Sequence, residues 1–150
     1  MSITVRQATA VDIEALAPLF DAYRQFYEQA SDLDLARAFL SERFAKAEST
    51  VYIAEDEKGT ALGFTQLYPS FSSTSAARIH ILNDLFVIPE GRGQGIARRL
   101  LTAAAEYGRA TSAVGLSLAT ARTNTAAQAL YRSAGWELDE VYLTYELALG

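Results

Sequence analysis

The 150-residue chain lacks cysteine altogether and contains a single histidine, His80. Without cysteine it can form no disulfide, no thiolate metal site and no cysteine nucleophile. One histidine is too few for a histidine-rich metal site, so we expect no metal. Basic residues are also fewer than acidic ones, 13 against 18, so the formal net charge is -5. This negative charge disfavours non-specific binding to nucleic acid.

Long apolar runs are absent as well. No stretch approaches the ~20 residues that a helix needs to cross a bilayer, and the first residues, MSITVRQATA, lack the apolar core of a signal peptide. We therefore expect a cytoplasmic protein with no membrane contact. The length suits one domain with one sizeable core, and no linker or internal repeat interrupts it, so residues 1–150 are predicted to form a single domain.

Apolar periodicity divides the chain into strand-like and helix-like segments. The predicted strands cover residues 2–7, 50–56, 60–69, 78–89 and 114–120, with one or two more in 136–149. The predicted helices cover residues 9–29, 32–47, 95–110 and 123–135. Pro18 lies well inside the first helical pattern and indicates a kink or a late helix start. This order predicts an α/β domain with a mixed sheet.

Three glycines alternate between the apolar run FVIPE and the third helix, at Gly91, Gly93 and Gly95. A strand, a glycine-rich turn and a helix N-terminus together favour an anion, because the first N–H groups of the helix lack partners and no side chains cover them. The turn matches neither the P-loop nor the GxGxxG dinucleotide pattern. The alternative is a tight strand-to-helix turn without a ligand.

The same stretch, RGQGIA, resembles the Arg/Gln-x-x-Gly-x-Gly/Ala signature of the GNAT superfamily of N-acetyltransferases, with Arg92, Gly95 and Ala97 at its fixed positions. The preceding LNDLFVIPEG resembles the central strand of the family, and TNTAAQALYRSAGW resembles its second motif. The resemblance implies a GNAT-like, mostly antiparallel sheet with a splayed parallel strand pair and helices on both faces. It also implies an acetyl-CoA-dependent N-acetyltransferase.

The resemblance assigns the groups that would bind acetyl-CoA. Backbone amides in the turn would hold the pyrophosphate, and backbone groups of the central strand would pair with pantetheine and the acetyl oxygen. The turn residues are Arg92, Gly93, Gln94, Gly95, Ile96 and Ala97, and the strand residues are Leu85, Phe86 and Val87. Ala97 replaces the glycine that is commoner at its position. Asn124 would hydrogen-bond pantetheine, and it also suits the N-cap of the fourth helix.

Two residues are candidates for proton transfer. Tyr131 lies seven residues after Asn124, the spacing at which the family places a general acid beside the sulfur, although an ordinary core tyrosine is the alternative. Asp84 interrupts an apolar strand beside the expected acetyl site and is the candidate base, with a structural hydrogen-bonding role as the alternative. Asn83 departs from the polyamine-acetylating branch, which is acidic there, and this weakens the case for polyamines and for a dedicated base.

The acceptor is expected beside the end of the first helix. There YRQFYEQASDLDL combines Tyr23, Phe26 and Tyr27 with Glu28, Asp32 and Asp34, a composition that attracts an ammonium group. We predict a small cationic amine that contacts Tyr27, Glu28 and Asn83. The alternative places the acids at a solvated helix start.

Two other functions compete with transfer to a small amine: acetylation of proteins or peptides, and catalytically silent binding of acyl-CoA. A homodimer is compatible with each of them.

Overall fold

The structure, a computed structural model, describes residues 2–150, and its internal contacts divide the chain into two compact units, one ending at Ala119 and one covering Thr120–Gly150. The strands are β1 (Ile3–Gln7), β2 (Thr50–Asp56), β3 (Ala61–Ser72), β4 (Ala77–Val87) and β5 (Gly115–Ser117). The helices are α1 (Ile13–Phe26), α2 (Leu33–Ala45), α3 (Ile96–Ala110) and α4 (Thr125–Ser133). Short 3-10 turns cover Ala10–Asp12 and Pro89–Gly91.

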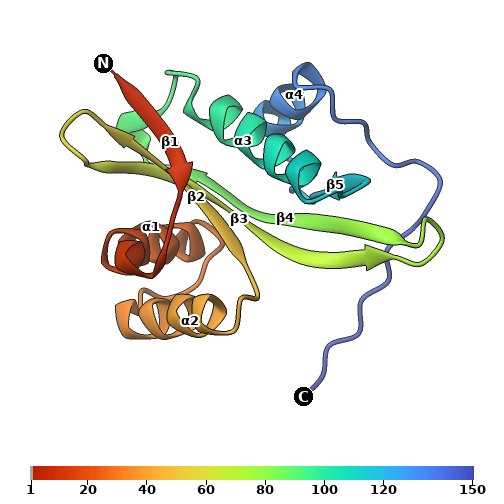
Figure 1. Ribbon diagram of the computed structural model, residues 1–150, viewed down its shortest axis with the longest axis horizontal. Helices are drawn as coiled ribbons and strands as arrows, with labels where there is room; N and C mark the ends of the chain where they lie inside the picture. The colour runs from red at the N-terminus through yellow and green to blue at the C-terminus, as the bar shows by residue number, and fades with distance from the viewer. Residues whose placement is uncertain (1) are drawn as a thin grey trace. The chain divides into compact units, whose positions relative to one another are not determined.

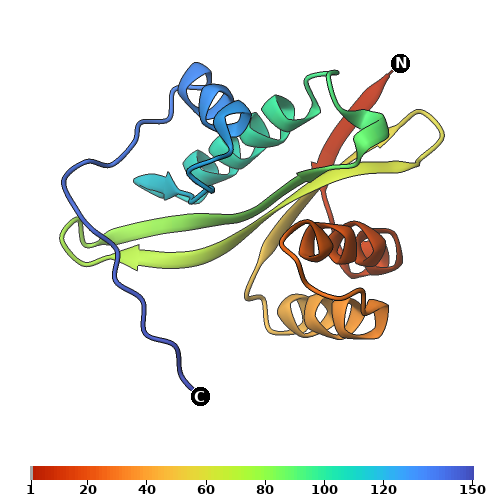
Figure 2. The same ribbon diagram turned by 180° about the vertical axis from the view of Figure 1, so that it is seen from behind.

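The first unit contains a five-stranded sheet in the order β1-β2-β3-β4-β5 (Figures 1 and 2). Each strand pairs antiparallel with the next, except that β4 and β5 run parallel. The predicted mixed α/β sheet with one parallel pair is confirmed. Parallel pairing requires a crossover, and α3 supplies it between β4 and β5.

Helices cover both faces of this sheet, with α1 and α2 on one side and α3 on the other (Figure 1). The α1–α2 layer buries Leu16, Phe20 and Leu40 against Phe64 of β3, and α3 buries Ile96 and Leu100 on the opposite face. Burial of each such side chain stabilises the fold by about 1.5–3 kcal/mol.

The structure shows where α1 starts and which residues of α2 are buried. The chain enters α1 through the Ala10–Asp12 turn, so α1 starts late, at Ile13, and includes Pro18 near its beginning. In α2, Ala36 and Leu40 are buried, whereas Leu35 is 48% exposed. Phe39 and Phe44 of the same helix pack against this core.

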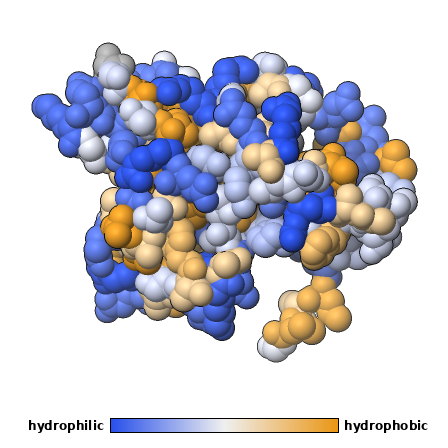
Figure 3. Space-filling view, viewed as in Figure 1, coloured by the Kyte–Doolittle hydropathy of each residue, from blue (hydrophilic) through white to orange (hydrophobic). Residues whose placement is uncertain are grey.

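The second unit contains α4 followed by an extended stretch, and the predicted strands in residues 136–149 are wrong. Residues 137–150 contain no strand, and the apolar side chains of Val141, Tyr142 and Leu143 are 79–82% exposed. Figure 3 shows this terminal stretch as mostly orange and tan atoms. Alternation gives a segment the side-chain pattern of a strand, but a strand also needs a partner ladder. Here the Asp139 carboxylate accepts from the N–H groups of residues 141 and 142 instead.

Candidate active site

The parallel pair separates early and leaves part of β4 without a strand neighbour. β4 pairs with β5 at Ile79, His80 and Ile81, whereas β4 continues to Val87. Within the described residues, the β5-side edge of β4 is therefore unpaired beyond Ile81, which includes Leu85, Phe86 and Val87. An unpaired strand edge presents backbone N–H and C=O groups to an extended ligand.

A β-bulge lies at the start of this open edge. Gln66 of β3 is opposite Asp84, but the next residue, Leu67, is opposite Leu82, so Asn83 is the extra residue. Asn83 is exposed, and its backbone carbonyl accepts a hydrogen bond from the Tyr23 hydroxyl at 3.0 Å. Bulges bend a strand and redirect its side chains, and they are frequent beside active sites.

The Asp84 carboxyl group is buried beside this bulge and is 1% exposed. Burial raises the pKa of Asp84 to about 6, although hydrogen bonds from Asn83 and Gln66 act in the opposite direction. Asn83 Nδ2 lies 2.8 Å from Oδ1, and Gln66 Nε2 lies 2.6 Å from Oδ2. Such a carboxyl group exchanges its proton near neutral pH, which is what a general base requires.

The glycine turn leads from the end of β4 into α3. Gly93 and Gly95 have left-handed φ angles of 79° and 76°, and a Cβ on either would meet nothing within 4 Å. Gly91 differs, because a Cβ there would lie 3.1 Å from Val87 Cγ1. Gly91 therefore serves packing, whereas the other two provide unusual backbone angles on an open surface.

The backbone donors of this turn are available to a ligand. Five consecutive N–H groups donate no hydrogen bond within residues 2–150, those of Gly93, Gln94, Gly95, Ile96 and Ala97. The N–H of Arg92 differs, since it donates to the Pro89 carbonyl at 3.3 Å. The Arg92 side chain donates to the Val87 carbonyl at 3.0 Å and lies over the Phe86 ring. The unpaired amides, the open surface at the glycines and the start of α3 fit a pyrophosphate.

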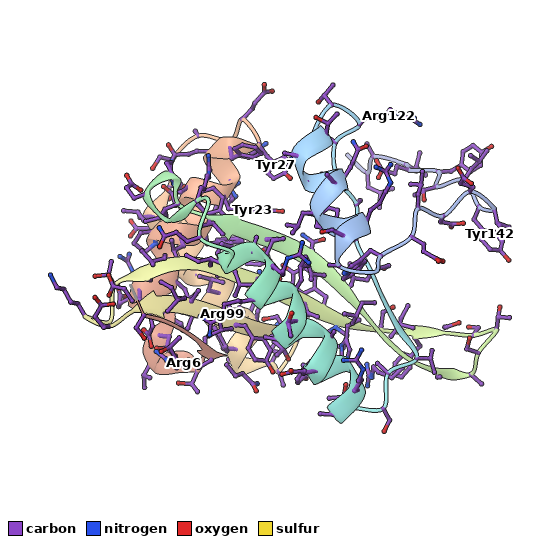
Figure 4. The ribbon with its side chains drawn as sticks, turned by 90° about the horizontal axis from the view of Figure 1, so that it is seen from above. Arg6, Tyr23, Tyr27, Arg99, Arg122 and Tyr142 are labelled. Atoms are coloured by element: carbon purple, nitrogen blue, oxygen red, sulfur yellow. The ribbon has the colours of Figure 1, made fainter. Side chains whose placement is uncertain are left out.

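Aromatic side chains connect the bulge to the end of α1. The Tyr23 ring lies 6.4 Å from Phe86 and 5.1 Å from Tyr27, which in turn is 5.2 Å from Phe26. Phe26 and Tyr27 are 57% and 46% exposed. Figure 4 labels Tyr23 and Tyr27 at the end of α1. An exposed aromatic surface therefore begins next to the bulge at Asn83.

The acids near this surface are largely engaged elsewhere. Asp32 caps α2 by accepting from the Leu35 N–H at 3.0 Å, and Asp34 pairs with Arg37 at 3.0 Å. For these two, the structure matches the helix-start alternative. Glu28 is exposed and has a left-handed φ of 67°.

The carboxylate of Asp21, a residue that no sequence motif singles out, joins α1 to the start of α2. It accepts from Ser31 Oγ at 2.7 Å and from the Asp32 N–H at 2.8 Å. These two bonds keep the pKa of Asp21 below its ordinary value, because they favour the charged form.

In the second unit, the side chain of Asn124 caps α4 by accepting from the Ala127 N–H at 3.1 Å. The Tyr131 ring lies 6.2 Å from Trp136, just after α4. Both residues predicted from the second motif therefore belong to one short helix and its C-terminal turn.

Neither a metal cluster nor a membrane span is found in the part of the chain that the structure describes. Residues 2–150 contain no group of three or more His, Asp or Glu side chains placed to hold a metal ion. None of their helices is both long and apolar enough to cross a bilayer. His80 is buried, hydrogen-bonds Thr111 at 2.9 Å and packs on Tyr107.

The mixed sheet with its open β4 edge and the anion-binding turn describe a small-ligand site, and comparison with known proteins identifies the family. The acetyltransferase (GNAT) family matches residues 14–136, so the chain belongs to this family. An uncharacterized N-acetyltransferase of Bacillus subtilis, YhfO, is 50% identical over 95% of each chain. The crystal structure of a probable acetyltransferase superposes with a TM-score of 0.93, at 42% identity and 98% coverage of each chain. The protein is thus an acetyl-CoA-dependent acetyltransferase.

More distant relatives carry names that specify a substrate. An aminoglycoside N(6')-acetyltransferase type 1 of Stenotrophomonas maltophilia is 26% identical, over 97% of this chain and 94% of its own length. An aminoglycoside N-acetyltransferase in complex with CoA shares the fold at a TM-score of 0.82 and 20% identity, over 99% of this chain and 96% of the other.

Proposed function

We propose that the protein transfers the acetyl group of acetyl-CoA to a primary amine of a small molecule, by direct attack in a ternary complex. One arrangement carries the proposal. The open edge of β4 begins at a bulge that holds a buried carboxyl group, and it ends in a turn with five unpaired amides. Along one strand, such an arrangement offers backbone groups to a thioester, a carboxyl group as a base and amide donors to a pyrophosphate.

The turn and the strand would share the binding of acetyl-CoA. The amides of residues 93–97 would hold the pyrophosphate, helped by the partial positive charge at the start of α3. Backbone groups of Leu85, Phe86 and Val87 would pair with pantetheine, and Asn124 would add a hydrogen bond. Bound acetyl-CoA supplies a thioester, whose carbonyl carbon an amine can attack. Holding both substrates together supplies up to ~7–11 kcal/mol in ideal cases.

Proton transfers at the amine nitrogen and at the sulfur complete the reaction. An alkyl ammonium group has a pKa near ~10, so it must lose a proton before it can attack. Asp84 would accept this proton, directly or through one water, because its raised pKa places it within reach of neutral pH. Tyr131 would give its proton to the departing thiolate, since a phenol is protonated at neutral pH, and would recover one from the second proton that the nitrogen releases as the amide forms.

The acceptor would lie against the aromatic surface at the end of α1. Tyr27 would contact the ammonium group by a cation–π interaction, Glu28 would pair with it, and Asn83 would bind it beside the bulge. Asp32 and Asp34 are engaged at the start of α2, so we assign them no contact with the acceptor. The relative named for aminoglycosides, small molecules with several amino groups, supports a small cationic acceptor.

We propose that both units form one acetyltransferase domain, because the family match of residues 14–136 extends across the boundary at residue 120. We further propose a cytoplasmic location and a homodimer. Sedimentation would test the dimer.

A screen of acceptors tests the proposed function. The purified protein is incubated with acetyl-CoA and a panel of cationic, neutral and anionic amines, amino acids and peptides, and both CoA thiol and acetylated product are measured. We expect product from small cationic amines, with activity that falls when Glu28 is made neutral. Activity confined to peptides would indicate a protein acetyltransferase, and binding of CoA without any product would indicate a silent module. Either result would contradict the proposal.

A further inference from the structure

A buried glutamine faces Asp84 across the sheet. Gln66 lies on β3 opposite Asp84 and is fully buried. Its amide Nε2 lies 2.6 Å from Asp84 Oδ2. Hydrogen bonds to a charged acceptor are stronger than those between neutral groups, so an amide donor at this position favours the ionised carboxylate.

The other half of the same amide has no partner. Oε1 of Gln66 is buried and accepts no hydrogen bond among the described residues. A buried acceptor without a partner destabilises a fold, and an apolar side chain of similar size would avoid that cost. Packing therefore does not explain a glutamine here, whereas the carboxylate of Asp84 does.

The surroundings of Asp84 contain neutral donors in place of a cation. Asn83 binds Oδ1 from β4, and no ion pair of the described residues includes Asp84. The titratable and charged groups near it include Tyr68, Tyr23 and Arg43 of α2; the charge of Arg43 lowers the pKa of Tyr68, whereas burial and two hydrogen bonds act on the pKa of Asp84. Tyr68 of β3 has a raised pKa, because of burial and the charge of Asp84, and the Tyr23 hydroxyl of α1 donates to the Asn83 carbonyl. An arginine or lysine paired with the carboxylate would hold it ionised well below neutral pH and make it a poor base.

We propose that Gln66 is a positioning residue, whose amide fixes the orientation of the Asp84 carboxylate and favours its ionised form without neutralising its charge. The relevance of this to catalysis rests on the proposed role of Asp84 as the base. The hydrogen bond itself is a property of the resting protein. The two claims can therefore be tested separately.

The first test measures the protonation of Asp84 without substrate. Protein labelled with ¹³C at aspartate side chains is titrated by NMR, and the Asp84 signal is assigned from its loss in Asp84→Asn. Gln66→Met keeps the size of the side chain but removes the donor, so the pKa of Asp84 should rise by about 1–2 pH units.

Thr65→Val is the matched control. Thr65 is equally buried on β3, but its hydroxyl donates to the backbone carbonyl of Asp84 at 2.8 Å rather than to the carboxylate. This variant should leave the pKa of Asp84 unchanged. An unchanged pKa in Gln66→Met, or equal rises in both variants, would overturn the proposal.

The second test measures rate against pH with an acceptor found in the screen. In Gln66→Met the acid limb of kcat/KM should move to higher pH by the same amount as the NMR titration. A shift of the Asp84 titration without a shift of the rate profile would support the role of Gln66 and contradict the role of Asp84 as base.

Should Gln66→Met fail to fold, Gln66→Glu preserves the shape of the side chain. Its two facing carboxyl groups should then retain one shared proton above pH 7, and ionisation of both below pH 6 would overturn the proposal.

Discussion

Replacing Asp84 by asparagine should make the protein more stable at pH 8 while removing most of its activity. The pKa of Asp84 is about 6 in the folded chain, against an ordinary value of 3.8. Between these values the folded state binds more protons than the unfolded state, so the free energy of unfolding falls as pH rises through that window. The difference between the two pKa values corresponds to about 3 kcal/mol in the free energy of unfolding, and this contribution is fully lost above pH 6.

Asparagine resembles the neutral carboxyl group and avoids this cost at every pH. Urea denaturation at pH 8 should therefore show Asp84→Asn more stable than the wild type by up to about 3 kcal/mol, and the two should converge near pH 3.5. Loss of the base should lower the rate by ~10²–10⁴-fold. A variant that is less stable at pH 8, or whose stability difference does not change with pH, would refute the reasoning.

Asp12 gives a control of opposite sign. Its carboxylate accepts two hydrogen bonds from the Arg6 guanidinium, at 2.8 Å and 3.0 Å, and this partner lowers the pKa of Asp12. Stability from such a group is present above its unfolded pKa and is lost as pH falls through its folded pKa. Asp12→Asn should therefore destabilise the protein at pH 8, and the difference should shrink in acid.

Further predictions concern acetyl-CoA and the acceptor. Gly95→Ala and Gly59→Ala both place a side chain at a left-handed φ with open space around it, so each should lower the free energy of unfolding by about 1–2 kcal/mol. Only Gly95→Ala should weaken CoA binding, measured by calorimetry. Equal CoA affinities of the two variants would show that the turn does not bind CoA. Tyr131→Phe should keep CoA affinity and lower the rate by ~10²–10⁴-fold, and an unchanged rate with chemistry rate-limiting would reduce Tyr131 to a packing residue. Tyr27→Leu should raise KM for cationic acceptors more than for neutral ones, and equal effects would contradict a cation–π contact.

Features set by neighbouring residues could be predicted from the sequence. The positions of Gly93 and Gly95 between an apolar run and a helical pattern locate the turn, and both have the left-handed angles that favour glycine. The cap formed by Asn124 follows from the residue type before α4. In each case the partner is within a few residues, so local chemistry determines the outcome.

Features that depend on distant pairing could not be predicted. The bulge at Asn83 exists because of the register with β3, and Gln66 meets Asp84 only across that register, 18 residues away in the chain. The terminal stretch shows the converse, because its alternating residues predict a strand, although no described residue pairs with it. Alternation specifies which side chains share a face, whereas a ladder requires a partner whose position lies elsewhere in the sequence.

Initial-rate kinetics with both substrates varied test direct transfer most directly. If the amine attacks acetyl-CoA within a ternary complex, double-reciprocal plots should intersect, and the protein incubated with acetyl-CoA alone should keep its unmodified mass. Parallel lines, together with a protein mass raised by one acetyl group that an amine then removes, would show a covalent acetyl-enzyme and contradict direct transfer.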